Sequence, residues 1–267
     1  MSKSQSTITL ITDFGIQDGY VGMMKGVITG INPSVSIIDI SNTIEAQNIF
    51  QAAYVLKSSY KYFPKGTIHI VVVDPGVGSE RKILCLKTAD YFFLAPDNGV
   101  LSFIAAIEES HSVWEVTNKE FFLPEISNTF HGRDIFAPVA AHLSKGINHK
   151  KLGKMIDEIR KIDLPKPIRS TDGVLTGEVI YVDYFGNLIT NITNKIINRT
   201  KVKSRKLSIV AGGKRIHKLS NSYTDVKDKE VLAIIGSTGF LEISVNQGNA
   251  KDVLQLKKGD KLVLGYE

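Results

Sequence analysis

The chain has 267 residues, of which 43% are hydrophobic and 22% charged, with a formal net charge of +6. This composition is typical of a globular protein and excludes a fibrous or disordered chain. No apolar run approaches the roughly 20 residues of a membrane helix, the N-terminus lacks the apolar core of a signal peptide, and the single cysteine, Cys85, has no disulfide partner. We therefore expect a cytoplasmic protein with no membrane partner.

The first half of the chain alternates short β-branched runs with stretches whose apolar residues recur at helical spacing. This alternation is typical of an α/β domain with Rossmann-like layers, in which helices cover a mostly parallel sheet. In chain order, the predicted elements are a strand at 8–12, a helix at 20–31, a strand at 35–40, a helix at 46–60, strands at 68–73, 82–86 and 91–94, a helix after the Asn98-Gly99 turn, and a helix at 134–143.

Two carboxylates follow predicted strands in this half. Asp13 comes directly after the run at 8–12, and Asp74 comes after the run at 68–73, which we expect to be a central strand buried on both faces. Because ligands bind beyond the carboxyl ends of the strands in open α/β sheets, we expect both carboxylates to meet at one crevice. Arg81 follows Asp74 across a Pro-Gly turn and is able to hold an anion or polarise a water beside it. A purely structural turn explains these residues equally well.

The segment NTFHGRDIFAPVAAHL at 128–143 places a His-Gly-Arg-Asp loop before an apolar helix. Gly132 leaves backbone space beside His131, so that the imidazole is able to face a pocket. Asp134 is expected to cap the helix N-terminus, and His142 is expected to have a structural role inside the helix.

The composition changes between 147 and 170, where the chain becomes polar and charged and contains Pro165 and Pro167. We interpret this segment as a linker between an α/β catalytic domain at 1–165 and a second domain at 166–267. The second half consists of short alternating runs separated by glycine turns. This pattern predicts an all-β module, either a small barrel or a sandwich.

Two turns of the β module contain groups suited to binding a small polar ligand. In VDYFGNLITNI at 182–192, Phe185 offers a face for stacking, and Asn187 offers paired hydrogen-bonding groups close to Asp183. The Gly-Ser-Thr-Gly turn at 236–239 presents backbone amides that are able to bind a carboxylate. Ordinary hairpin turns remain the alternative for both segments.

A basic run lies between residues 195 and 218, with nine Lys and Arg and no acidic residue. The run has neither interleaved aromatics nor a recognisable nucleic-acid motif, so we interpret it as a solvated face and expect no nucleic-acid partner. The sequence also lacks HExxH, CxxC and GxSxG motifs. We therefore expect no metal site and no serine nucleophile.

Six motifs in order are together more specific than any one of them: LITDFG, VVDPGVGS, PDNG, FHGRD, DYFGNLITNI and GSTGFLEISVNQGNA. In this order the chain resembles the S-adenosylmethionine (SAM) hydroxide adenosyltransferases, which are relatives of the fluorinase and chlorinase. The resemblance implies an α/β N-terminal domain, a C-terminal β-barrel, and a homotrimer whose active sites lie between subunits. It also implies hydrolysis of SAM to adenosine and L-methionine by in-line attack of an activated water on C5′, with SAM as substrate and no cofactor. A module that binds SAM or adenosine as a sensor, with little turnover, is the alternative.

The resemblance also implies roles for individual residues. The water-holding triad of the family corresponds to Asp74, Arg81 and His131, and its ribose-binding carboxylate corresponds to Asp13. The adenine and methionine contacts correspond to Asp183, Phe185, Asn187, Ser237, Glu242 and Val245. An intact triad argues against halide as the nucleophile. The chain departs from the halogenases at Gln47, where they have an aromatic residue, and at Thr238, where they have a cation beside the methionine carboxylate.

Overall fold

The computed structural model describes residues 6–163, 165–200 and 206–266. The chain forms two compact units, Met1–Ile162 and Asp163–Glu267, each with its own core. No helix in the described ranges is long and apolar enough to cross a membrane.

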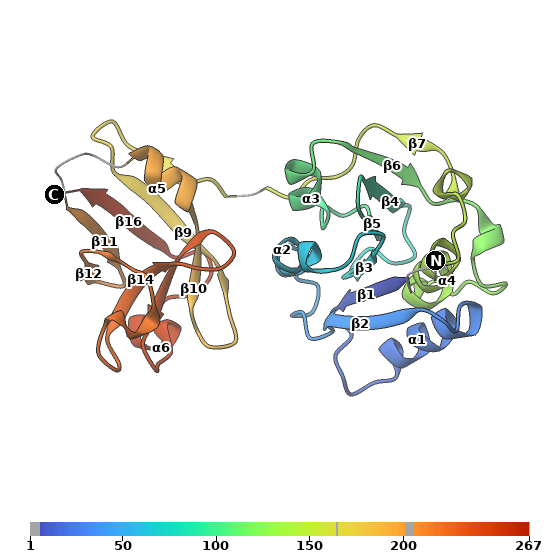
Figure 1. Cartoon of the computed structure of the whole chain (residues 1–267), viewed down its shortest axis with the longest axis horizontal. Helices are drawn as coiled ribbons and strands as arrows, with labels where there is room; N and C mark the ends of the chain where they lie inside the picture. Colours follow the sequence, from blue (N-terminus) through green and yellow to red (C-terminus); the bar gives the residue numbers. More distant parts are fainter. Residues whose placement is uncertain (1–5, 164, 201–205, 267) are drawn as a thin grey trace. The chain divides into compact units, whose positions relative to one another are not determined.

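The N-terminal unit is built on a seven-stranded sheet (Figure 1). Its strands are β1 (Thr7–Thr12), β2 (Ser36–Ser41), β3 (Ile68–Val72), β4 (Ile83–Thr88), β5 (Phe92–Pro96), β6 (His111–Glu115) and β7 (Met155–Ile156), in the spatial order β2-β1-β3-β5-β4-β6-β7. The pairs β2–β1, β1–β3 and β3–β5 are parallel, and β4 and β7 are the two strands that run against the rest. The prediction of a mostly parallel sheet is confirmed.

Helices cover both faces of this sheet (Figure 1). On one face α1 (Tyr20–Ile31) packs against α4 (Ala137–Ser144), and both share a core with Ile8 and Leu10 of β1. Since side chains alternate along a strand, Ile11 points to the opposite face, where α2 (Ile49–Ser59) and α3 (Ser102–Ile107) lie. Short 3₁₀ turns connect these elements at Tyr60–Tyr62, Lys119–Phe121 and His149–Leu152.

The central strand β3 contains one polar residue, His69, which is fully buried. Its Nδ1 atom lies 2.7 Å from Thr9 Oγ1, and its ring stacks on Phe93 with a centroid distance of 5.1 Å. Burial lowers the pKa of His69 to about 3, so that the imidazole is neutral and packs as an aromatic core residue. The strand is therefore buried on both faces in spite of this histidine.

The helix expected at 134–143 begins differently. A π-helical turn, Gly132–Phe136, precedes α4, and the expectation that Asp134 caps a helix N-terminus was wrong. Asp134 is fully buried, and its carboxylate accepts hydrogen bonds from the Ser127 amide and hydroxyl, each at 2.8 Å, and from Arg133 Nε at 2.6 Å. The carboxylate thus binds the loop before the helix and does not cap the helix N-terminus.

The segment expected to be a linker is folded in its first part. The 3₁₀ turn at His149–Leu152 leads into β7, which pairs with β6 and completes the sheet. Its polar composition reflects a sheet edge and a turn rather than an unstructured connection, so the linker prediction was wrong for these residues.

The C-terminal unit is a curled sheet, in the order β12-β11-β16-β9-β10-β15-β14-β13, with β8 paired to β9. Its strands are β8 (Ile168–Arg169), β9 (Leu175–Val182), β10 (Leu188–Thr193), β11 (Leu207–Ala211), β12 (Lys214–Ile216), β13 (Leu219–Ser220), β14 (Val231–Ile235), β15 (Phe240–Val245) and β16 (Lys261–Tyr266). The sheet curls until β12 approaches β14 near its opposite end, which confirms the barrel-like β module. Two short helices, α5 (Asn194–Thr200) and α6 (Ala250–Leu254), and a 3₁₀ turn, Tyr223–Asp225, complete this unit.

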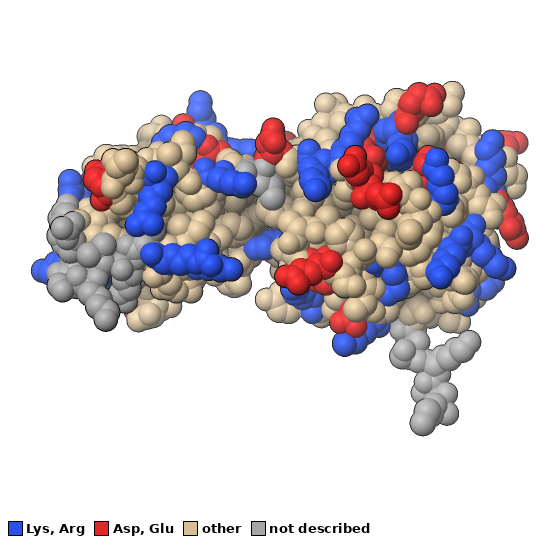
Figure 2. All heavy atoms as spheres, turned by 90° about the horizontal axis from the view of Figure 1, so that it is seen from above, with Lys and Arg blue, Asp and Glu red and all other residues tan. Residues whose placement is uncertain are grey.

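The described members of the basic run lie on α5, β12 and the adjoining segments. Their side chains are exposed: Lys195, Arg199, Lys206, Lys214, Arg215 and Lys218. Figure 2 shows Lys and Arg side chains on the visible face of each unit, with Asp and Glu interspersed. Lys201, Lys203 and Arg205 lie outside the described residues. That this run binds no nucleic acid stays a prediction.

Candidate active site

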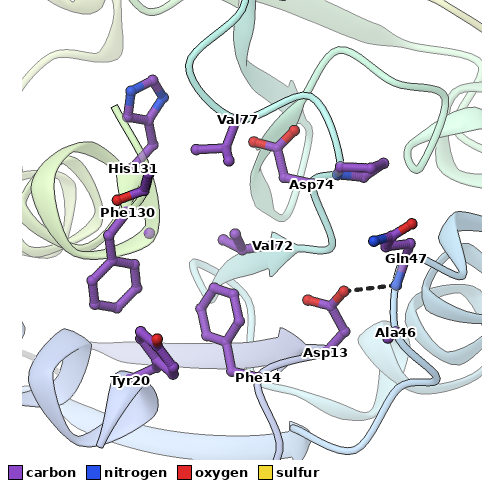
Figure 3. Close-up of a pocket in the computed structure, with 13 residues that line it drawn as sticks. Asp13, Phe14, Tyr20, Ala46, Gln47, Val72, Asp74, Val77, Phe130 and His131 are labelled. Carbon is purple, nitrogen blue, oxygen red and sulfur yellow. Dashed lines mark hydrogen bonds between the residues drawn. The ribbon is translucent and has the colours of Figure 1, made fainter. Parts of the chain in front are cut away.

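A cavity of about 450 Å³ opens in the N-terminal unit beyond the carboxyl ends of β1 and β3. Asp13 follows β1 and Asp74 follows β3, and Figure 3 shows both carboxylates at this cavity, with His131 across from Asp74. The parallel arrangement of β1 and β3 brings the two strand ends to the same edge. The two carboxylates that the sequence placed after separate strands therefore share one cavity.

Asp74 forms a buried ion pair with Arg81. Arg81 Nε lies 3.0 and 2.8 Å from the two carboxylate oxygens, Nη2 lies 2.5 Å from Oδ2, and both side chains are only 4% exposed. The turn between them requires glycine at position 78, because φ is +77° and a Cβ would lie 2.4 Å from the carbonyl oxygen of Asn128. This turn reverses the direction of the chain after β3, so that Arg81 lies beside Asp74 at the carboxyl end of that strand.

His131 is the third member of this cluster. Arg81 Nη2 donates a hydrogen bond to His131 Nδ1 at 2.9 Å, and a guanidinium has no lone pair to accept one. Nδ1 must therefore be unprotonated, which places the proton of the neutral ring on Nε2. Burial lowers the pKa of His131, and the charge of Arg81 lowers it further, against smaller opposing effects of Asp74 and Asp134.

Asp13 is held by the backbone of a strained residue. The amide of Gln47 donates to Asp13 Oδ2 at 2.8 Å, and Gln47 adopts a positive φ of 64° (Figure 3). This conformation is unfavourable for a residue with a side chain. The loop before α2 is therefore strained at Gln47 in the conformation in which its amide points to the carboxylate. Gln47 thus holds Asp13 through its main-chain amide, independently of its side chain.

An aromatic wall closes one side of the cavity. Phe14, Tyr20 and Phe130 pack edge to face or tilted, with centroid distances of 5.2 to 5.8 Å (Figure 3). Sequence reasoning did not single out these side chains, although Phe14 and Phe130 belong to two of the quoted motifs. The wall gives the cavity an apolar side opposite its charged groups.

The C-terminal unit has a cavity of its own, of about 940 Å³. All six residues that the sequence predicted as adenine and methionine contacts line it: Asp183, Phe185, Asn187, Ser237, Glu242 and Val245. Phe185 lies at the tip of the β9–β10 turn and is 70% exposed. A ring presented in this way has a free face on which a flat ligand can stack.

Asp183 and Asn187 fasten the β9–β10 turn to itself. Asp183 Oδ1 accepts from the amides of Phe185 and Asn187 at 2.9 and 2.8 Å, and Oδ2 accepts from Asn187 Nδ2 at 2.9 Å. The turn also requires Gly186, since a Cβ at this position would lie 2.0 Å from Asn249 Oδ1. Both predicted side chains therefore use most of their hydrogen-bonding groups to shape the turn, and no residue in the described part of the chain donates to Asn187 Oδ1.

Glu242 lies in the middle of β15 and is 8% exposed. Its Oε1 accepts from the Tyr223 hydroxyl at 2.7 Å and from Ser244 Oγ at 2.8 Å. Sequence reasoning missed Tyr223, which lies in a polar loop with no motif around it. Ser237 is exposed and Val245 is buried, at opposite ends of the β14–β15 hairpin.

The structure thus gathers the four predicted N-terminal residues in one unit and the six predicted C-terminal residues in the other. Their individual roles stay predictions. Among the described residues, no group of three or more His, Cys, Asp or Glu is placed to hold a metal ion.

Two family models match the chain. The SAM hydroxide adenosyltransferase N-terminal domain matches residues 8–153, and the SAM hydroxide adenosyltransferase C-terminal domain matches residues 177–263. The chain therefore belongs to the SAM hydroxide adenosyltransferase family.

Relatives of known name support this assignment. The chain is 38% identical over 271 residues to the (R)-S-adenosyl-L-methionine hydrolase of Methanocaldococcus jannaschii, covering 97% of this chain and 95% of that one. It is 34% identical over 260 residues to the protein of the same name from Salinispora tropica, covering 96% of each chain. A fluorinase of Nocardia brasiliensis is 26% identical over 282 residues, with 94% of each chain covered.

A solved structure shares the fold over the whole length. The crystal structure of an uncharacterized conserved protein from Thermotoga maritima superposes with a TM-score of 0.88 at 39% sequence identity, covering 96% of this chain and 99% of that chain.

Proposed function

We propose that this protein hydrolyses S-adenosyl-L-methionine to adenosine and L-methionine, by in-line displacement at C5′ with water as the nucleophile. The observation that carries the proposal is the buried contact of Asp74, Arg81 and His131 at the cavity beyond β3. Relatives named as SAM hydrolases at 34 and 38% identity support it. The sensor alternative has no comparable observation in its favour.

The chemistry explains why such a cluster suffices. The leaving group is a neutral thioether, so no general acid is needed, whereas water must be positioned in line with the C–S bond and must lose a proton. Asp74 is the base in this proposal, because His131 Nδ1 already accepts from Arg81 and Nε2 carries a proton. Arg81 stabilises hydroxide character, and its pairing with Asp74 moderates that effect. Positioning of the water contributes on the order of 7–11 kcal/mol to lowering the barrier.

We assign the remaining residues to substrate binding. Asp13 binds the ribose hydroxyls, since its carboxylate is fixed at the same cavity as Asp74. Phe185 stacks on the adenine, and Asn187 Oδ1 accepts from its exocyclic amine. The displacement itself uses no group beyond protein, water and SAM, so we propose no cofactor.

We further propose a homotrimer in which the N-terminal cavity of one subunit and the C-terminal cavity of a neighbour bind one substrate. The exposed aromatic pair Tyr184 and Phe185, 96 and 70% exposed in the single chain, supports an interface there. Light scattering of the purified protein tests the trimer. Shared sites predict that co-assembled Asp74→Asn and Phe185→Ala chains include sites that combine the wild-type KM with the wild-type kcat, a combination that neither homotrimer has, and the absence of such sites contradicts sharing. With one buried cysteine and no disulfide, we place the protein in the cytoplasm.

The test of the function is incubation of the purified protein with SAM, followed by chromatography for adenosine and L-methionine. Stoichiometric appearance of both products is the expected result, and saturable binding without product favours the sensor. Separate incubations with the (R) and (S) sulfonium epimers define the substrate. Addition of chloride or fluoride is expected to yield no 5′-halogenated nucleoside, because the carboxylate of Asp74 lines the cavity and already pairs with Arg81.

A further inference from the structure

The C-terminal cavity has an unbalanced charge. Two carboxylates, Asp183 and Glu242, line it, and its described lining includes no lysine, arginine or histidine. Removing a carboxylate from water is costly unless a cation or several hydrogen-bond donors replace the water. The charge of the cavity lining therefore favours a ligand that carries a positive charge.

The two carboxylates are not equivalent. Asp183 uses both oxygens within its own turn, where three donors surround it. Glu242 accepts two hydrogen bonds, both at Oε1. Its Oε2 accepts none from the described residues and rests against Gly236, where a Cβ would lie 2.6 Å away. Of the two, Glu242 has the oxygen that is open to a ligand.

Tyr223 determines which oxygen of Glu242 is occupied. Its hydroxyl donates to Oε1 at 2.7 Å from a 3₁₀ turn that Ser222 caps and that Asp225 closes through the amide of Asn221. Burial raises the pKa of Tyr223, and the hydrogen bond to Glu242 and the negative charges of Glu242 and Asp183 raise it further, so the phenol is protonated and donates. With Oε1 saturated by Tyr223 and Ser244, the carboxylate keeps one orientation.

We propose that Tyr223 is a positioning residue that makes Glu242 the receptor for the α-ammonium group of the substrate. The assignment rests on the proposed function, which supplies a substrate with an amino-acid moiety. A primary ammonium is the complement of a desolvated carboxylate oxygen with no cationic partner, and such charge-assisted hydrogen bonds are stronger than neutral ones. The exocyclic amine of adenine is a neutral donor, and Phe185 and Asn187 provide for it elsewhere in the cavity.

Calorimetric binding of three ligands to the full chain tests this. The ligands are L-methionine, its desamino analogue 4-(methylthio)butanoate, and adenosine. The variants are Glu242→Gln, which keeps the shape and removes the charge, and Tyr223→Phe, which removes one hydroxyl. Tyr266→Phe is the matched control, because the Tyr266 hydroxyl donates to the carbonyl of Ile197 in the same unit, outside the cavity lining.

The measured quantity is the preference for L-methionine over its desamino analogue. We expect Glu242→Gln to reduce this preference by at least about tenfold, Tyr223→Phe to reduce it about three- to tenfold, and Tyr266→Phe to leave it unchanged. Adenosine affinity should stay the same in all variants. A merely structural role of Tyr223 would weaken all ligands together and leave the preference unchanged.

Three results overturn the proposal. These are an unchanged preference in Glu242→Gln or Tyr223→Phe, a selective loss of adenosine binding, and a wild-type protein that binds both methionine analogues alike or neither of them. Turnover of SAM is measured separately. If the protein discriminates between the analogues but produces no adenosine, the proposed hydrolase activity is wrong, whereas the proposed role of Glu242 in binding the ammonium group is retained.

Discussion

The two cavities of this protein differ in how a buried carboxylate is neutralised. In the N-terminal cavity the carboxylate of Asp74 is neutralised by Arg81 inside the protein, and both side chains are 4% exposed. In the C-terminal cavity, the donors to the carboxylate of Glu242 among the described residues are the hydroxyls of Tyr223 and Ser244. A group that acts on water must be held in place before the substrate arrives, whereas a binding group can let the ligand supply the missing charge. The difference separates the region proposed for chemistry from the region proposed for recognition.

The largest expected effect comes from Asp74→Asn. Removing the base is expected to lower kcat by about 10²- to 10⁴-fold, with KM changed little. Because Arg81 then remains buried without its counter-charge, unfolding should also become easier by about 3–5 kcal/mol. Steady-state kinetics with SAM measures the first effect, and denaturant unfolding measures the second.

The control for this variant is Asp39→Asn, which breaks an exposed ion pair with Lys25 and should leave kcat unchanged. Adenosine binding by Asp74→Asn verifies that the variant is folded. Unaffected turnover in Asp74→Asn would refute the assignment of the base.

The second effect concerns acid stability. In the N-terminal unit burial is the main cause that lowers the pKa of His69, His131, His142 and His149, whereas the histidine of the C-terminal unit, His217, is exposed. Below about pH 6.5 the unfolded chain binds protons that the folded unit does not, so stability is full above that pH and falls as pH decreases. With its pKa at about 3, His69 alone should remove about 2 kcal/mol between pH 6.5 and 5.

The single tryptophan, Trp114, lies in the N-terminal unit and reports its unfolding by fluorescence. Amide hydrogen exchange in the same full chain reports the C-terminal unit. Equal loss of stability in the two units on acidification would show that the buried histidines do not cause the effect.

The third effect is expected from Phe185→Ala. Loss of a stacking face should raise KM about tenfold with kcat nearly unchanged, because the side chain contacts substrate away from the reacting atoms. Tyr62→Ala, which removes an aromatic ring that is 81% exposed and outside both cavity linings, is the control and should change KM by less than about twofold. A fall in kcat without a rise in KM would place Phe185 in the chemistry instead.

The smallest effect is expected from Gln47→Gly. Glycine adopts the positive φ of 64° without strain and keeps the amide that donates to Asp13. The free energy of unfolding should rise by a few tenths to about 1 kcal/mol, with KM and kcat nearly unchanged. Gln47→Ala, which removes the side chain and keeps the strain, should show no such gain. A large loss of activity in both variants would show that the amide side chain itself binds substrate.

Some of these features could be predicted from local sequence, and others could not. Apolar runs ending in Asp13 and Asp74 predict two strands and the edge at which their carboxylates meet, since strand direction and side-chain period are local properties. The protonated nitrogen of His131 depends on a contact with Arg81, 50 residues away, which no local pattern encodes.

The same reason explains the residues that were missed. Tyr223 acquires its role from a hydrogen bond to Glu242 on another element, and its own loop has only turn chemistry. Asp134 precedes a helical pattern and so predicts a cap, yet the π-helical turn and the contact with Ser127 bury it. In both cases tertiary packing overrides the local signal.

The proposed reaction is the attack of water on C5′ of SAM. The most direct test is to run the reaction in water enriched in the heavy oxygen isotope and to analyse both products by mass spectrometry. Each turnover is expected to place one heavy oxygen in the 5′-hydroxyl of adenosine and none in L-methionine. Adenosine without the label, or label in the methionine, would contradict it.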